Sequence, residues 1–415
     1  MRERGLTPRG ASKRHGARLM VGDAMTLTRA ASLSFVPFLI TVVAGCSGQG
    51  SSGQTVSAAP TTRTYYIAAD EVLWNYAPDG MNKITGKPFE GIAKVYTQRS
   101  PHHVGSVYRK AVYREYTDGT FTKLKTRPAD QQYLGLLGPV IHAQVGDTIK
   151  VVFKNNASRP YSMHPHGVQY DKMSEGVAYD DGSGTHDMMG DAVPPGQTFT
   201  YTWQVPERAG PGPGDPSSIV WLYHSHVDEQ KDVDAGLVGP IIVTAAGMAN
   251  ADGAPKDVDR EIVILMGFDD ENQSWYMLRN VAQFAPEVKG SGLSQAMPVD
   301  ANGLFTLTGS GFVDSNVKAV INGYMYGNGP RITMKKGERV RWYLMTIGMG
   351  FNFHTPHWHG NTVLWNRQRT DVVPLSPAQM ATVDMVPDSA GTWLFHCHVS
   401  DHMDGGMVTL YEVDP

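Results

Sequence analysis

The stretch AGTWLFHCHVSDHMDGGMVTLYEV, residues 390–413, places one cysteine between two histidines at the end of an apolar run. A related stretch, SSIVWLYHSHVDEQKDVDAGLVGPIIV, occupies residues 217–243 and has a serine in place of the cysteine. In both stretches a short apolar run leads into a His-x-His pair, and a second apolar run follows a polar segment. We interpret the two stretches as copies of one structural repeat.

The repeat extends upstream of both stretches. GDTIKVVFKNNASRPYSMHPHG (146–167) parallels GERVRWYLMTIGMGFNFHTPHWHG (337–360), since each has a glycine–acid turn, an alternating strand, a histidine pair and a glycine. Each half of the chain is therefore expected to be one β-sandwich of similar plan. We predict domains over 61–250 and 256–415, separated by the small polar segment at 248–258.

Composition supports an all-β protein. The chain has 415 residues with 45 glycines and 26 prolines, and its apolar runs are short and rich in Val, Ile, Tyr and Trp. This pattern indicates many strands joined by turns rather than long helices. The formal net charge of -4 argues against a nucleic-acid-binding protein.

The N-terminal 46 residues read as an export signal. MTLTRAASLSFVPFLITVVAGC (25–46) has a lightly basic start, an apolar run and small residues before Cys46. VAGC resembles a bacterial lipobox, in which the cysteine carries the lipid; a cleaved signal peptide and a membrane anchor are the alternatives. Residues 47–60 are expected to form a flexible tether. We therefore expect an exported, extracytoplasmic protein, held at the membrane through Cys46.

Most of the 15 histidines gather in clusters at matching places of the two halves. The clusters are His164 and His166; His224 and His226; His354, His357 and His359; and His396, His398 and His402. A single His-x-His pair is often just two hydrogen-bonded imidazoles. Repetition of the pair at four matching places instead predicts metal ligation.

Strand geometry predicts two kinds of metal centre. Residues i and i+2 of a strand point the same way, so each His-x-His pair can direct both imidazoles at one point. Cys397, between two such histidines, must face the opposite side, where His354, His402 and Met407 can join it. Two histidines, a thiolate and a weak methionine ligand are the donor set of a blue-copper electron-transfer site.

The motifs HPHG, HSH, HTPHWHG and HCHVSDHMDGGM together resemble the four copper-binding motifs of the multicopper oxidases, in the order of that family. Flanking segments such as YYIAADEVLWNYAPDG and INGYMYGNGP are similar to the ceruloplasmin and hephaestin branch. The resemblance spans about residues 64 to 413. It implies two cupredoxin-like Greek-key domains, as in two-domain, laccase-like members.

The resemblance implies four coppers per chain and assigns their ligands. Type 1 copper takes His354, Cys397, His402 and Met407. Type 2 copper takes His164 and His357. The two type 3 coppers take His166, His224 and His398 on one side, and His226, His359 and His396 on the other. Aligned with the second half, the first half has other residues at the type 1 positions: Tyr161, Ser225, Gln230 and Leu237.

The resemblance also implies a mechanism. A reductant gives single electrons to type 1 copper, and Cys397 passes them through His396 and His398 to the cluster that reduces O2 to water. Asp401 is the expected proton relay, by analogy with acidic residues at that place in the family. Because the segment IGMGFNF before His354 lacks acidic residues, a phenol or aromatic amine is favoured as reductant. Fe(II) or Cu(I) is the alternative.

Other readings explain less of the sequence. A zinc hydrolase needs three or four ligands rather than these two sets. A copper nitrite reductase also has two such domains and blue copper, but it has no use for all the paired histidines. A non-enzymatic binding protein of this fold would be expected to have lost ligands.

The resemblance finally predicts the assembly. A trinuclear cluster needs histidines from a first half and a second half, and in the six-domain ring of ceruloplasmin unlike domains meet all the way round. We therefore expect three copies of this chain to form a C3 homotrimer with clusters between protomers.

Overall fold

In the computed structural model, which describes residues 60–182, 188–288, 311–347 and 353–415, the repeat is visible in the strand order. The strands of the first half are β1 (Thr62–Asn75), β2 (Val107–Tyr116), β3 (Ile141–Gln144), β4 (Thr148–Asn155), β5 (His164–Pro165), β6 (Thr198–Gln204), β7 (Ser218–His224) and β8 (Val238–Thr244). They form two four-stranded sheets with the orders β2-β1-β4-β6 and β3-β8-β7-β5.

The second half repeats this plan. Its strands are β9 (Arg260–Asp270), β10 (Val317–Ile321), β11 (Ile332–Lys335), β12 (Val340–Thr346), β13 (Pro356–Trp358), β14 (Val363–Trp365), β15 (Gln368–Thr370), β16 (Met380–Met385), β17 (Gly391–Cys397) and β18 (Val408–Asp414). One sheet has the order β10-β9-β12-β16-β14-β15, and the other has the order β11-β18-β17-β13. The β14–β15 hairpin is the addition that distinguishes this half.

Pairing directions match between the halves as well. β1 runs parallel to β4, and β9 runs parallel to β12. β3 runs parallel to β8, and β11 runs parallel to β18. Parallel pairs within otherwise antiparallel sandwiches require crossover connections, so this shared pattern is a topological repeat rather than a chance likeness. The predicted all-β fold is confirmed.

Burial follows strand position. β4 alternates, with Ile149, Val151 and Phe153 fully buried and the residues between them more exposed. β12 is instead buried at every residue. Its outer side is covered by the first half, because one hydrophobic cluster joins Val220 and Leu222 of β7 to Trp342 and Leu344 of β12. The two pairs of sheets thus share a continuous core, while the division into domains at 248–258 stays a prediction.

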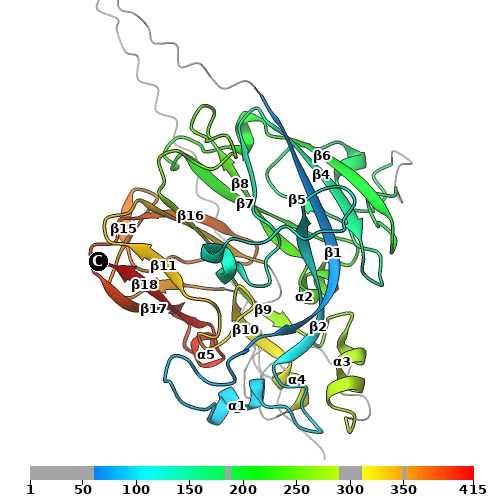
Figure 1. The fold of residues 1–415 in the computed structure, drawn as a ribbon, viewed down its shortest axis with the longest axis vertical. Helices are drawn as coiled ribbons and strands as arrows, with labels where there is room; N and C mark the ends of the chain where they lie inside the picture. Colours follow the sequence, from blue (N-terminus) through cyan, green and yellow to red (C-terminus); the bar gives the residue numbers. More distant parts are fainter. Residues whose placement is uncertain (1–59, 183–187, 289–310, 348–352) are drawn as a thin grey trace, which may run out of the picture. The chain divides into compact units, whose positions relative to one another are not determined.

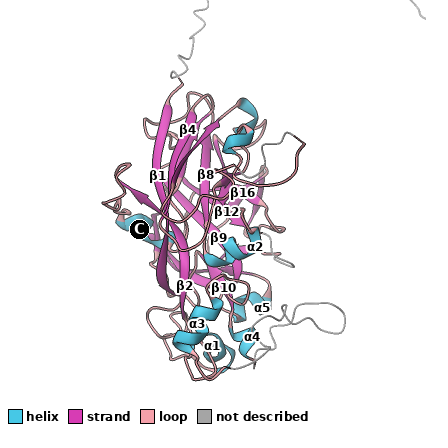
Figure 2. Cartoon of the chain, turned by 90° about the vertical axis from the view of Figure 1, so that its right-hand side faces the viewer, coloured by secondary structure: helices cyan, strands magenta, loops and turns pink. Residues whose placement is uncertain are grey.

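Helices are short and lie mainly in the connections. They are α1 (Gly91–Thr97), α2 (Glu229–Ala235), α3 (Met277–Phe284), α4 (Phe312–Ser315) and α5 (Ser400–Asp404), with 3-10 turns η1 (Ala129–Leu134), η2 (Lys172–Ser174) and η3 (Glu207–Ala209). Figures 1 and 2 show α1, α3, α4 and α5 gathered at one end of the strands. We call residues 76–106, which link β1 to β2 and include α1, together with α4, the helical cap. It brings first-half residues to the end where α5 lies.

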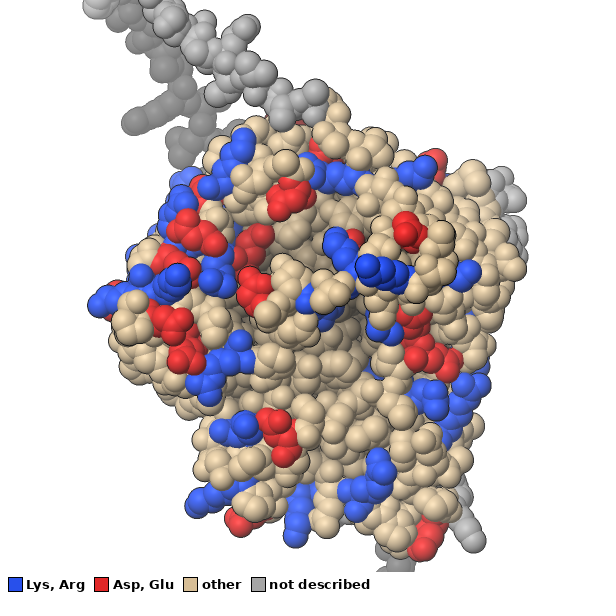
Figure 3. All heavy atoms as spheres, viewed as in Figure 1, with Lys and Arg blue, Asp and Glu red and all other residues tan. Residues whose placement is uncertain are grey.

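The surface carries both signs of charge. On the face seen in Figure 3, lysine and arginine side chains are interspersed with aspartate and glutamate. Within the described residues no helix is long and apolar enough to cross a membrane. Cys46, the apolar run before it and the tether up to residue 59 lie outside the described residues.

Candidate metal centre

Three side chains from two segments meet inside the second half. Cys397 ends β17, His402 lies in α5 five residues on, and His354 precedes β13. The Cys397 Sγ atom lies 3.5 Å from His402 Nδ1 and 3.9 Å from His354 Nδ1, and the two Nδ1 atoms are 3.2 Å apart. The three ligand atoms therefore converge on one point, as the sequence predicts.

The surroundings of this point are buried and largely apolar. Cys397, His354 and Met407 are fully buried, and the Phe268 ring lies 4.7 Å from the His402 ring. The Cys397 amide donates to the Met407 carbonyl at 3.1 Å, which holds the two main-chain segments side by side. The Thr355 amide lies 3.3 Å from Sγ and can donate to a thiolate.

Burial also sets the protonation of these groups. It lowers the pKa of His354 to about 3 and that of His402 to about 4, so both imidazoles are neutral at neutral pH. Burial raises the pKa of the Cys397 thiol, which therefore keeps its proton until a cation replaces it. Neutral imidazoles, a thiol and a buried thioether are a soft donor set that fits copper.

A second group of histidines lies on the other face of β17. His396 pairs in register with His357 of β13, and its Nε2 atom lies 3.2 Å from His357 Nδ1 and 3.1 Å from His359 Nε2. The His396 Nδ1 atom is held 2.8 Å from the Cys397 carbonyl. The His398 ring lies 4.9 Å from the His357 ring and is exposed. Cys397 of the buried thiol site is linked to this group through the main chain, because its two sequence neighbours, His396 and His398, belong to the group.

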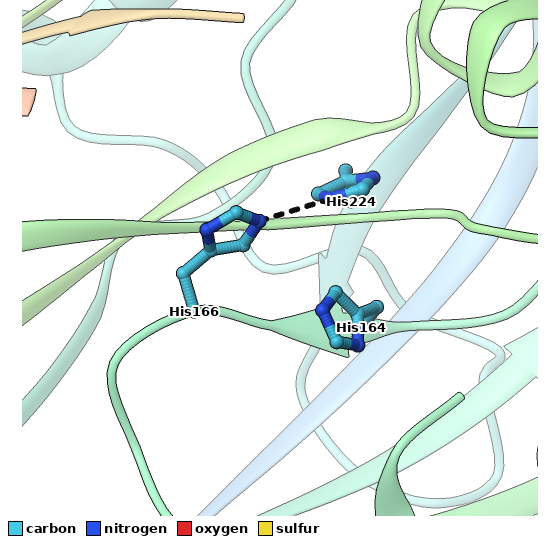
Figure 4. A group of neighbouring side chains, drawn as sticks. All are labelled: His164, His166 and His224. Atoms are coloured by element: carbon cyan, nitrogen blue, oxygen red, sulfur yellow. Dashed lines mark hydrogen bonds between the residues drawn. The ribbon is translucent and has the colours of Figure 1, made fainter. Parts of the chain in front are cut away.

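The first half builds the matching group (Figure 4). His164 of β5 pairs in register with His224 of β7, and His224 Nε2 lies 3.1 Å from His166 Nε2. The His226 ring lies 5.3 Å from the His164 ring. Burial lowers the pKa of His166 to about 4 and that of His224 to about 3, which keeps both available as neutral ligands.

Strand alternation accounts for only part of this convergence. β5 ends at Pro165 and β13 ends at Trp358, so His166 and His359 lie just beyond their strands. The glycine after each pair takes a left-handed conformation, with φ of +74° at Gly167 and +73° at Gly360. A turn thus brings the second imidazole back toward the first, where the sequence analysis expected a continuous strand.

In one chain the two histidine groups stay separate. Ring contacts and short nitrogen distances join members of each group, and among the described residues none joins a histidine of the first half to one of the second. His226 and His398 lie outside the tight triplets of their groups.

The first half has no thiol site at the equivalent position. Tyr161 is fully buried there and its hydroxyl lies 3.1 Å from that of Tyr276. Ser225, in the place of Cys397, donates to Asp232 at 2.7 Å. Gln230, aligned with His402 by sequence, is exposed, and the buried Asp232 in α2 fills the space instead. The alignment missed Asp232 because α2, which ends before Gly236, is two residues longer than α5, the matching helix of the second half.

Carboxylates near the histidine groups were also missed by sequence reasoning. Glu229 lies 3.5 Å from His226 Nε2, and Asp371 lies 3.7 Å from His357 Nε2. Spacing could have suggested Glu229, three residues from its partner. Nothing in the sequence suggested Asp371, because it comes close to His357 only through the pairing of its segment with β13. Asp401, the expected proton relay, is exposed in α5 beside His402.

The fold and the site define a class: an all-β protein of paired Greek-key sandwiches with a His-Cys-His copper motif. Multicopper oxidase family models match residues 124–247 and 296–415. The chain belongs to the multicopper oxidase family.

Curated relatives lie in the ceruloplasmin and hephaestin branch. Ferroxidase HEPHL1 of Homo sapiens is 43% identical over 356 residues, which are 85% of this chain and 29% of that protein. Hephaestin of Mus musculus is 39% identical over 85% of this chain and 29% of its own length. Ceruloplasmin of Rattus norvegicus is 37% identical over 89% and 32%, respectively. The chain thus spans less than a third of the length of these relatives.

Solved structures agree on the fold. The multicopper oxidase mgLAC aligns with a TM-score of 0.51 at 21% identity, covering 85% of this chain and 86% of that chain. A copper nitrite reductase from Nitrosomonas europaea aligns with a TM-score of 0.51 at 18% identity, covering 85% and 94%. Both are similar in their two-sandwich architecture.

Proposed function

We propose that the protein couples one-electron oxidation of a reductant to the four-electron reduction of O2 to water, using four coppers per chain. The observation that supports this most is the His396-Cys397-His398 tripeptide. Its thiol joins His354 and His402, while its two histidines belong to the opposite group. Copper would supply the redox chemistry, and the chain supplies donors, spacing and exclusion of water.

His354, Cys397, His402 and Met407 would hold type 1 copper. For the other three coppers we propose the ligands that the resemblance implies. His164 and His357 would hold type 2 copper. The remaining six paired histidines, His166, His224, His226, His359, His396 and His398, would hold the two type 3 coppers. Buried Phe268 and Met407 exclude water from the thiol. His402 is the ligand that reaches the surface, since it is partly exposed while His354 is not. Electrons from outside would therefore arrive at the His402 edge.

A low-valent metal ion, Fe(II) or Cu(I), is the reductant that we propose. Relatives at 37% to 43% identity bear the names ferroxidase, hephaestin and ceruloplasmin, which outweighs the preference for phenols drawn from the sequence. That preference rested on IGMGFNF, most of which lies outside the described residues. Asp401 and Asp404 are exposed on α5 around His402 and suit a cation.

A further carboxylate, that of Asp314 in α4, lies on the helical cap. Burial raises the pKa of Tyr96 in α1, and the negative charges of Asp314 and Asp401 raise it further. The same tyrosine thus feels a carboxylate from α4 and one from α5. These acidic groups would attract a cation to the His402 edge, whereas a neutral phenol gains nothing from them.

Assembly follows from the two separate histidine groups. Each offers four imidazoles in one chain, and His398 in one group is exposed while His226 in the other is partly so. Joining the first-half group of one protomer to the second-half group of the next completes each set. A closed ring of three copies does this for every group, so we propose a C3 homotrimer with shared clusters.

The proposed location is extracytoplasmic, with a lipid on Cys46. This rests on the sequence of residues 25–46. Cys46→Ala should release active protein from the membrane fraction, because the sequence of residues 47–60 is that of a flexible linker. Wild-type protein free of lipid would remove the anchor.

Oxygen uptake by the copper-loaded protein tests the function. Fe(II) should drive uptake with saturation kinetics, and a simple phenol should give a rate at least about tenfold lower. Zinc-bound protein without oxygen uptake would contradict the proposal. Uptake with phenols alone would restore the laccase-like alternative.

A further inference from the structure

Lys318 of β10 is a buried lysine, and within the part of the chain that the structure describes no carboxylate is in direct contact with it. Its side chain is fully buried, and Nζ donates to three main-chain carbonyls: Tyr96 at 2.6 Å, Gly105 at 2.9 Å and Ser315 at 2.5 Å. The Tyr108 ring lies 5.0 Å from the same nitrogen. Three carbonyl oxygens around the nitrogen are enough to accept every N–H group that the amine carries, with or without its extra proton.

These three acceptors belong to different segments of the helical cap. Tyr96 is in α1, Gly105 is in the turn before β2, and Ser315 ends α4. An apolar side chain in β10 would pack here without the desolvation cost of an amine. What the lysine adds is a single point that fixes two helices and a turn from both halves of the chain.

The cap is in turn joined to α5. Tyr96 belongs to the same hydrophobic cluster as Met325 and Tyr326. The Tyr326 hydroxyl donates to the Asp404 carbonyl at 2.9 Å, and its amide donates to the Gly406 carbonyl at 2.9 Å. The segment from 404 to 406 begins two residues after His402, so a shift of the cap would reach the surface edge of the thiol site.

We infer that Lys318 is a positioning residue for the reductant. It ties α1 to α4, and Tyr326, which packs in the same hydrophobic cluster as Tyr96, bonds to the end of α5. The lysine thereby fixes the acidic surroundings of His402. Asp314 is next to the acceptor Ser315, and Asp401 and Asp404 lie in α5 itself. The inference rests on the proposed oxidation of a metal ion at this edge. It assigns the lysine no direct contact with the reductant.

The test compares steady-state oxygen uptake of copper-loaded, full-length wild type and Lys318→Met over a range of Fe(II) concentrations. The variant should raise KM for Fe(II) about tenfold with kcat nearly unchanged, because misplaced carboxylates weaken capture without altering the copper. The blue absorption should stay at the wild-type position. Lys94→Met, which removes an exposed lysine of α1, is the matched control and should leave KM unchanged.

Tyr326→Phe removes only the hydroxyl that holds the Asp404 carbonyl, and it decides the matter if Lys318→Met does not fold. A raised KM in Tyr326→Phe supports the inference. Wild-type KM values in every variant that folds would overturn it, while the proposed function would stand. Absence of Fe(II)-dependent uptake in the wild type would overturn the proposed function, and the inference with it.

Discussion

Cys397 shows how much chemistry one residue can decide. Its Sγ lies within 3.9 Å of both His354 Nδ1 and His402 Nδ1, while its main-chain neighbours His396 and His398 turn to the opposite group. The side chain and the backbone of one residue therefore serve two centres. Alternation along β17 makes this possible, because consecutive residues of a strand face opposite sides.

Cys397→Ser should abolish the blue colour and reduce oxygen uptake by at least about 100-fold, because a hydroxyl is a poor ligand for copper and a poor electron path. Copper bound by the two histidine groups should be retained, since those imidazoles face elsewhere. Absorption spectroscopy and copper analysis of the purified variant provide the measurement. A variant that stays blue would show that the ligand assignment is wrong.

At the scale of elements, a glycine packed on a tryptophan closes both histidine-bearing turns. A Cβ atom at Gly360 would lie 2.4 Å from the Trp393 ring, and one at Gly167 would lie 2.2 Å from the Trp221 ring. The indole nitrogens donate to main-chain carbonyls, Trp393 to Ser389 and Trp221 to Ala209, so the rings cannot retreat freely. The repeat thus preserves a packing contact along with the histidines.

Gly360→Ala should destabilise the protein by about 3 kcal/mol, from the clash with Trp393 together with the left-handed backbone. Gly337→Ala is the matched control, because its φ of +84° is similar but nothing lies within 4 Å of the added methyl. The control should cost only about 1 kcal/mol. Urea unfolding of both variants measures the difference, and equal losses would remove the packing argument.

The buried lysine of β10 predicts a pH dependence of stability. Burial lowers the pKa of Lys318 to about 7, whereas the unfolded chain holds that proton up to about 10.4. Between these values the unfolded state binds more protons, so the free energy of unfolding should rise with pH through this group. From pH 7 to pH 9 the wild type should gain about 2 kcal/mol relative to Lys318→Met, a difference in which titrations shared by both proteins cancel.

Urea unfolding of wild type and Lys318→Met at the two pH values provides the measurement. The stability of Lys94→Met should change with pH as that of the wild type does, because the variant keeps Lys318 and the lysine that it replaces is exposed on α1. A wild-type advantage that falls with rising pH would show that the folded amine keeps its proton more tightly than the unfolded one.

At the scale of the whole molecule, the proposed trimer predicts that the histidine groups of two protomers must combine for activity. A variant lacking His164 and His166 and another lacking His396 and His398 should each be inactive. Refolded together, they should regain part of the oxygen uptake, because some interfaces then join two intact groups. Light scattering should give the mass of three chains, and an active monomer would rule out the shared cluster.

The sequence by itself determined the fold class, the internal repeat and the convergence of His354, Cys397 and His402. These follow from local rules: alternation of period two, the positions of turn glycines and the preference of a thiolate and imidazoles for copper. His354, Cys397 and His402 meet as predicted because each lies close in sequence to a strand whose direction the repeat already defines.

Only the tertiary structure decided which distant segments surround the site. Lys318, Tyr96 and Ser315 meet because residues 76–106 of the first half pack on the second, and no periodicity encodes that contact. Asp232, rather than Gln230, fills the first-half site because α2 lengthens a turn. The physical reason is common to both: side-chain alternation is set by neighbouring peptide units, whereas loop placement depends on the sum of many weak packing contacts between residues far apart in the chain.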